Sequence, residues 1–139
     1  MKRTFKDLSK YITLTMLAAP VFGALPAAAQ EAVVAPVLHQ TAMAGLEGME
    51  ANIVRFDVEP GWATPRHTHP GHLFVYVVEG TLEIDVEGAA ARTILAGEAV
   101  YELPEVPMVG ANASSSEGAV FIVFQVGSEG EPLMVAHTD

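Results

Sequence analysis

The segment that decides the fold is GWATPRHTHPGHLFVYVVEG, residues 61–80. His67 and His69 lie two residues apart in it, and an unbroken apolar run, residues 73–78, follows them. Successive side chains of an extended chain point to opposite faces, so both imidazoles point the same way if this segment is a strand. Two imidazoles on one strand face are a donor pair that a β-barrel can offer to a metal ion.

The first 29 residues have the composition of an export signal. Basic residues precede a mostly apolar run, and small residues of the A-x-A type close the segment. Cleavage is expected between Ala29 and Gln30, which would place the mature chain in the periplasm or outside the cell. An uncleaved membrane anchor is the alternative, but prolines and a glycine interrupt the short apolar run. We predict three parts: a signal peptide (1–29), an N-terminal arm (30–49) and a barrel domain (50–139).

The mature chain is strongly acidic. Removing the signal takes away four of the seven basic residues and one of the 17 acids, which leaves a formal charge of −13 on residues 30–139. Such a surface repels nucleic acid and anionic lipid, so neither is expected as a partner. An anionic substrate is also disfavoured unless an arginine turns into the pocket. We expect Arg55 and Arg66 to form surface ion pairs instead.

The sequence contains no cysteine. Thiolate metal sites, iron–sulfur clusters, cysteine nucleophiles and disulfides are therefore excluded. The stability of the domain must come from its core, and about 110 residues suffice for one compact core.

Beyond residue 50 the chain has the pattern of short strands separated by Gly and Pro turns, with no helical segment. This predicts an all-β antiparallel sandwich or closed barrel. The expected strands are 53–58, 66–69, 72–78, 81–86, 92–95, 99–103, 106–109 and 119–126, with short edge strands near 33–38 and 133–136.

The run 73–78 is apolar at every position, so both faces of the strand are apolar. A strand of this kind is buried twice, once in the barrel and once beneath another layer or a second subunit. We therefore expect a homodimer.

Residues 61–80 resemble the first cupin motif, which reads Gly, five residues, His-x-His, three or four residues, Glu, six residues, Gly. Gly61, His67, His69 and Gly80 match it at the right spacing, and Leu73 stands where the glutamate would be.

The second cupin motif is matched less closely. Gly97, Pro104 and Asn112 fit its pattern, while Glu105 replaces its second glycine and Met108 its histidine. The chain is therefore identified as a small single-domain cupin of the quercetin dioxygenase-like kind, with two of the four usual metal-ligand positions altered. The resemblance implies a jelly-roll β-barrel with an internal pocket.

Cupins commonly hold a divalent metal through two histidines, a glutamate and a third histidine, and only His67 and His69 carry over. Our first hypothesis is a barrel that binds or weakly processes a small organic ligand, in which these histidines are hydrogen-bonding or acid–base groups. The pocket surface would come from Trp62, Leu73 and Met108, together with Phe74, Tyr76 and residues 121–124.

The alternative is a metal-dependent cupin enzyme, of the dioxygenase or isomerase type, that holds iron or copper on His67 and His69. His72 and Met108 would complete a soft set suited to copper, although strand alternation points His72 the other way. For iron, a carboxylate from Glu102 or Glu105 would complete a two-histidine, one-carboxylate set. A purely structural role for the histidine pair is the remaining alternative.

Overall fold

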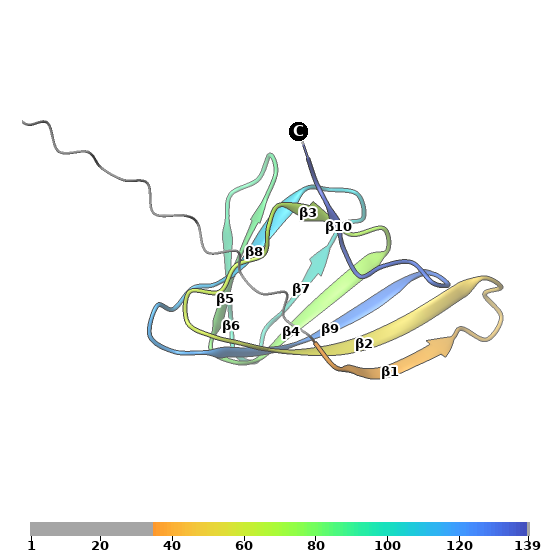
Figure 1. Ribbon diagram of the computed structural model, residues 1–139, viewed down its shortest axis with the longest axis horizontal. Helices are drawn as coiled ribbons and strands as arrows, with labels where there is room; N and C mark the ends of the chain where they lie inside the picture. Colours follow the sequence, from red (N-terminus) through yellow and green to blue (C-terminus); the bar gives the residue numbers. More distant parts are fainter. Residues whose placement is uncertain (1–34, 139) are drawn as a thin grey trace, which may run out of the picture.

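The computed structural model describes residues 35–138, which form ten strands in two facing antiparallel sheets (Figure 1). The predicted signal peptide and the first residues of the predicted arm lie outside the described residues. Within the described range, no helix has the length and apolar character needed to cross a membrane. The strands are β1 (Val37–Ala42), β2 (Met49–Val58), β3 (His67–Thr68), β4 (His72–Glu79), β5 (Thr81–Val86), β6 (Arg92–Leu95), β7 (Ala99–Glu102), β8 (Met108–Asn112), β9 (Ala119–Ser128) and β10 (Val135–Ala136).

The large sheet has the strand order β1-β2-β9-β4-β7, and the small sheet has the order β10-β3-β8-β5-β6. Strands β2 and β9 pair over ten residues, from Met49 opposite Ser128 to Val58 opposite Ala119. Consecutive strands β2 to β5 alternate between the two sheets, as in a jelly roll. The predicted all-β antiparallel architecture is confirmed.

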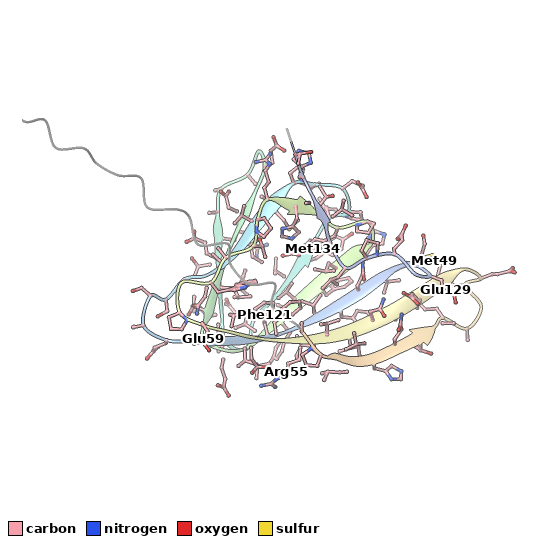
Figure 2. All side chains as sticks on the ribbon, in the orientation of Figure 1. Met49, Arg55, Glu59, Phe121, Glu129 and Met134 are labelled. Atoms are coloured by element: carbon pink, nitrogen blue, oxygen red, sulfur yellow. The ribbon has the colours of Figure 1, made fainter. Side chains whose placement is uncertain are left out.

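The core lies between the two sheets, and β4 shows how the sequence places it there. Leu73, Val75 and Val77 point inward and are at most 4% exposed, because every second side chain of a strand faces the same side. Figure 2 shows the same division on neighbouring strands, with Phe121 pointing between the sheets and Arg55 pointing away from them.

Several strands differ in extent from their predicted ranges. Strand β2 starts at Met49 rather than residue 53, and β1 lies inside the predicted arm, where it pairs along β2. Strand β8 starts at Met108 rather than residue 106, because a turn at Pro104–Glu105 precedes it and Glu105 adopts a positive φ of 59°.

Gly80 makes the tight turn from β4 to β5. Its φ is +77°, and a Cβ there would lie 2.7 Å from the Gly118 carbonyl oxygen and 2.9 Å from the Ala119 Cα. Gly88 has nearly the same φ, +78°, but a Cβ there would meet nothing within 4 Å. Comparing an alanine substitution at Gly80 with one at Gly88 therefore distinguishes the cost of steric contact from the cost of backbone strain.

We predict that Gly80→Ala lowers the free energy of unfolding by about 3 kcal/mol, because it adds a backbone collision to left-handed strain. Gly88→Ala is the matched control and should cost about 1 kcal/mol, from strain alone. Urea denaturation of both variants measures the difference. Equal losses would show that the chain around Gly118 yields without cost.

Candidate functional site

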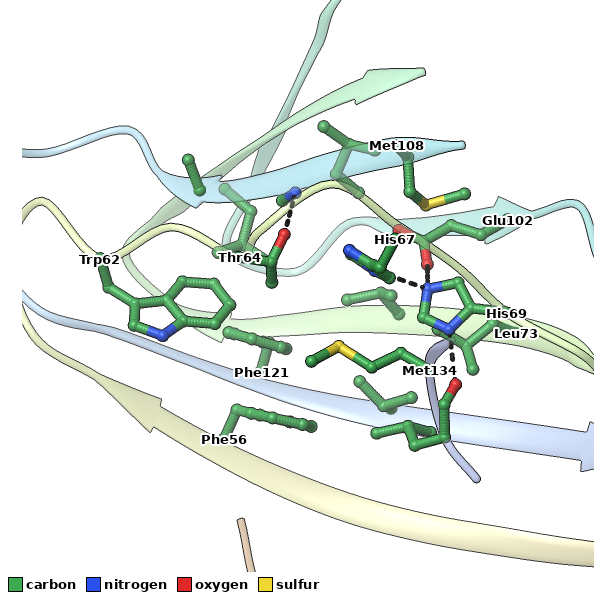
Figure 3. Close-up of a pocket in the computed structure, with 17 residues that line it drawn as sticks. Phe56, Trp62, Thr64, His67, His69, Leu73, Glu102, Met108, Phe121 and Met134 are labelled. Atoms are coloured by element: carbon green, nitrogen blue, oxygen red, sulfur yellow. Dashed lines mark hydrogen bonds and ion pairs between the residues drawn. The ribbon is translucent and has the colours of Figure 1, made fainter. Parts of the chain in front are cut away.

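A cavity of about 160 Å³ lies between the sheets and is lined mainly by apolar side chains (Figure 3). Only four of its 17 described lining residues have hydroxyl, imidazole or carboxylate side chains, and none is Arg or Lys. These four polar residues are Thr64, His67, His69 and Glu102. The cavity is therefore an apolar chamber with one polar end.

The polar end is built on the two histidines. His67 and His69 are each 4% exposed, and their rings meet edge to face with centroids 4.7 Å apart. The two Nε2 atoms lie 3.1 Å from each other. The predicted common orientation of the two imidazoles is therefore present in the structure.

Glu102 brings a carboxylate to this pair from another strand. It is 7% exposed, and its Oε2 lies 3.2 Å from His69 Nε2. In the register of β4 with β7, Glu102 stands directly opposite Leu73. The carboxylate thus enters the cavity beside position 73, one strand away.

The other nitrogen of each ring is bonded to the main chain. His67 Nδ1 lies 2.9 Å from the Pro65 carbonyl oxygen, and His69 Nδ1 lies 2.7 Å from the Leu133 carbonyl oxygen. A carbonyl oxygen only accepts hydrogen bonds, so each Nδ1 carries a proton and donates it. In the neutral rings, each Nε2 then holds a lone pair.

Three electron-pair donor atoms therefore converge at the polar end: two imidazole nitrogens and one carboxylate oxygen. Atoms of this kind are stable side by side only when a proton, a hydrogen-bond donor or a cation lies between them. Burial holds the pKa of His67 below its ordinary value of 6.5, and the neighbouring His69 lowers it further, against the hydrogen bond to Pro65 and the charge of Glu102. Protonation of His67 is therefore disfavoured at this end of the cavity.

The C-terminal segment, residues 129–138, closes this side of the cavity. Strand β10 pairs with β3, which sets Ala136 opposite His67. Leu133 and Met134 line the cavity, and Figure 3 shows the Met134 side chain extending across it. No local sequence pattern marks Leu133 or Met134 as a pocket residue, whereas the alternating pattern of residues 53–58 could have indicated Phe56.

The structure brings several predicted site residues together. Leu73 and Met108 line the cavity and are each 2% exposed, and Met108 stands opposite His67 in the register of β3 with β8. Trp62 lines the cavity wall, with its ring 5.7 Å from that of Phe121.

Several other predicted site residues lie outside the cavity. His72 is exposed on the outer face of β4, where its Nδ1 contacts the Tyr101 hydroxyl, so it is not brought to His67 and His69. Glu105 is exposed in the turn after β7. Phe74, Tyr76 and Phe124, which were expected to line the pocket, point outward because they occupy the alternate strand positions.

Neither Arg55 nor Arg66 lines the cavity. Arg55 pairs with Asp57 at 2.8 Å, and Arg66 pairs with Glu87 at 2.8 Å.

As the side chains stand, no group of three or more His, Cys, Asp or Glu residues within 35–138 is arranged to hold a metal ion. His69 Nε2 instead contacts His67 and Glu102 directly.

A cupin domain model matches residues 54–124, which is half of the chain and includes both motifs and the polar end of the cavity. The chain belongs to the cupin family. No curated protein matches this cupin. The family assignment confirms the fold that the first motif predicted.

Solved structures agree with the assignment. A conserved uncharacterized protein with a double-stranded β-helix domain from Klebsiella pneumoniae has a TM-score of 0.60 at 17% identity, over 76% of this chain and 84% of that one. A cupin-like protein from Thermotoga maritima has a TM-score of 0.52 at 27% identity, over 66% and 65%. Oxalate oxidase in complex with glycolate has a TM-score of 0.51 at 25% identity, over 64% of this chain but only 46% of the oxidase.

We predict that metal-free protein, kept with a chelator, loses stability as the pH falls from about 7.5 to about 5. The unfolded chain binds a proton at His67 near pH 6.5, whereas the folded chain resists it, so the stabilisation is present above pH 6.5 and lost below it. His67→Gln should reduce this loss. Urea unfolding at both pH values measures it.

The exposed His39 of β1 supplies the control, because His39→Gln should keep the full pH dependence. Hydrogen bonding by Asn52 lowers the pKa of Glu50 from 4.5, and hydrogen bonding by Arg55 lowers the pKa of Asp57 from 3.8. Protonation of these two acids therefore affects stability only below the pH range of this test. An unchanged loss in His67→Gln would assign the effect to another group.

Proposed function

We propose that this cupin binds, or weakly processes, a small and mostly apolar molecule whose polar head donates a hydrogen bond, such as a hydroxyl or phenol. The observation that supports this is the composition of the cavity, an apolar chamber that ends in the three converging atoms of His67, His69 and Glu102. Pockets of this kind gain affinity from apolar contact and orientation from a few polar anchors.

The cavity volume limits the ligand. An apolar cavity of about 150 Å³ accommodates a benzene molecule in an engineered protein. The volume here, about 160 Å³, therefore suits a single ring or a short branched chain. Met134 forms part of the wall and is 43% exposed, so the chamber has an exposed side at this residue.

The electrostatics select the head group. Carboxylates and phosphates need a cationic partner when they are buried, and no described lining residue is Arg or Lys. A hydroxyl instead donates a hydrogen bond to an imidazole nitrogen or to the Glu102 carboxylate. The His69–Glu102 pair is also suited to accept a proton as a general base, which is the form that weak processing would take.

Three probes of one shape test this proposal: para-ethylphenol, ethylbenzene and para-ethylbenzoate. We expect para-ethylphenol to bind at least about tenfold more tightly than ethylbenzene, because a buried hydrogen bond contributes about 1.4 kcal/mol, and para-ethylbenzoate to bind least. Titration calorimetry measures all three. Glu102→Gln should reduce the preference for the phenol, whereas the exposed Glu105→Gln should leave it unchanged. Tighter binding of the benzoate, or no binding of any probe, would refute the proposal.

A second candidate function is metal-dependent catalysis, and the position of Glu102 favours it. The donor set of two imidazoles and one carboxylate fits the chemistry of ferrous iron. His67, His69 and Glu102 would hold the ion, which would supply Lewis-acid or redox chemistry. Met108 next to His67 would give a softer set for copper. In this proposal, Glu102 takes the role of the glutamate that Leu73 replaces.

Metal content of the purified protein, measured by mass spectrometry after loading with iron, copper, manganese or zinc, separates the two functions. A metal site predicts about one ion per chain, with at least a tenfold loss of affinity in Glu102→Ala and no loss in Glu105→Ala. Full metal occupancy in Glu102→Ala would show that Glu102 is not a metal ligand. Less than about a tenth of an ion per chain would favour the metal-free pocket.

A further inference from the structure

The C-terminal segment connects the two sheets across one side of the chamber. At its start, Glu129 N donates to the Gly48 carbonyl oxygen at 2.9 Å, next to β2 of the large sheet, and at its far end β10 pairs at the edge of the small sheet. Leu133 and Met134 lie between these ends and line the chamber. Met134 is 43% exposed and its side chain extends across the chamber (Figure 3). The middle of the segment therefore separates the chamber from solvent.

Two buried side chains hold the middle of the segment in place. Gln125 Nε2 donates to the Pro132 carbonyl oxygen at 3.1 Å, and His69 Nδ1 donates to the Leu133 carbonyl oxygen at 2.7 Å. Gln125 is 2% exposed and His69 is 4% exposed. Residues 132–134 form no further hydrogen bond within the described range, 35–138. The main chain of this part of the wall is thus held by two side chains of the domain.

Another loop that lines the chamber is held more firmly. Thr64 N donates to the Gly110 carbonyl oxygen and Gly110 N donates to Thr64 Oγ1, at 2.8 and 2.9 Å. Asn112 N donates to the Trp62 carbonyl oxygen at 2.8 Å. Local opening requires least free energy where few hydrogen bonds and contacts hold a segment. Of these two loop walls, residues 132–134 therefore open more readily.

Empty space lies beside this weakly held wall. Leu133 lines the chamber and also a second cavity of about 240 Å³, whose other lining residues belong to β1, β2, β9 and the C-terminal segment. Side chains in a protein interior are close-packed, so one of them usually moves only when its neighbours yield. The second cavity removes this requirement, because Leu133 can leave the chamber wall without displacing buried atoms.

We propose that residues 132–134 are a gate through which a molecule enters the chamber, and that Leu133 moves into the second cavity as the gate opens. The gate rests on the proposed function only for the identity of the molecule that enters. Opening breaks the bonds from Gln125 and His69, so the His69 Nδ1 proton loses its acceptor and meets water. The His67 Nδ1 proton keeps its bond to Pro65, which is outside the gate. Movement of the gate therefore has a signature that needs no ligand.

Exchange of the two Nδ1 protons with water, measured by NMR, tests this signature. We expect the His69 proton to exchange at least about tenfold faster than the His67 proton, because only the former is protected by the gate. Gln125→Leu removes the bond to Pro132 and should accelerate the His69 exchange by a further factor of about ten, without changing that of His67. Gln40→Leu is the matched control, since Gln40 bonds Glu50 and not the gate, and it should change neither rate.

An engineered disulfide tests the gate in the opposite direction. Thr68 and Val135 stand opposite each other in the register of β3 with β10. Opposite Cα atoms of antiparallel strands lie about 4.5–5.5 Å apart, which suits a disulfide. The chain has no cysteine, so Thr68→Cys with Val135→Cys can form only this bridge within one chain.

Oxidation of this variant should slow the His69 exchange at least about tenfold relative to its own reduced form, and should slow the association of para-ethylphenol by a similar factor. The matched control is Glu83→Cys with Thr93→Cys, an exposed opposite pair on β5 and β6. Its oxidation should change neither rate. Circular dichroism establishes that each variant is folded, and Gln125→Leu decides alone if the bridge at position 68 does not form.

The two measurements distinguish failure of the gate from failure of the proposed function. Absence of para-ethylphenol binding in both the oxidised and the reduced form would refute the proposed function, while the ring protons would still decide the gate. A His69 exchange rate that neither Gln125→Leu nor oxidation changes would overturn the gate. Equal changes at His67 and His69 would also overturn it, because they would indicate opening of the whole domain. Binding of para-ethylphenol at the same rate in both forms would show that the molecule enters elsewhere.

Discussion

The pairing register of β4 with β7 and β9 is the constraint on which the rest of the molecule depends. It turns Leu73, Val75 and Val77 toward the core and sends the alternate side chains outward. The same register sets Glu102 beside Leu73 and therefore beside the histidine pair. A slip of one residue would exchange the two faces, so the core, the polar end and the set of outward-facing side chains are fixed together.

The polar end combines groups from three separate parts of the chain. The two histidines come from the segment around β3, the carboxylate from β7, and the oxygens that fix the ring protons from Pro65 and Leu133. Burial strengthens their interactions, because little water competes with them. The result is a compact acceptor site in an apolar chamber, in a protein with few cations to offer elsewhere.

The sequence predicted those parts of the molecule that depend on local spacing. The two-residue separation of His67 and His69, the alternation in residues 73–78 and the turn at Gly80 all follow from local geometry, and the first motif led to the family. The inward position of Glu102 depends instead on a cross-strand register that is set by the intervening turns. Leu133 meets His69 across 64 positions of sequence, and no local pattern predicts that contact.

The expectation for Phe74 and Tyr76 shows another limit of sequence patterns. Both are apolar and adjacent to pocket residues, yet strand alternation places them on the opposite side of the sheet. A run that is apolar at every position does not indicate which of its side chains line the pocket, because the pairing register of the strand decides which face points inward.

The bonds from the two Nδ1 atoms end on main-chain oxygens, and this has an evolutionary consequence. Side-chain substitutions at positions 65 and 133 retain the carbonyl that fixes each imidazole tautomer. The residues that shape the chamber, such as Leu73 and Met108, are therefore free to diverge while the histidine pair keeps its electronic arrangement. A scaffold of this kind can change its ligand through successive substitutions without rebuilding its reactive end.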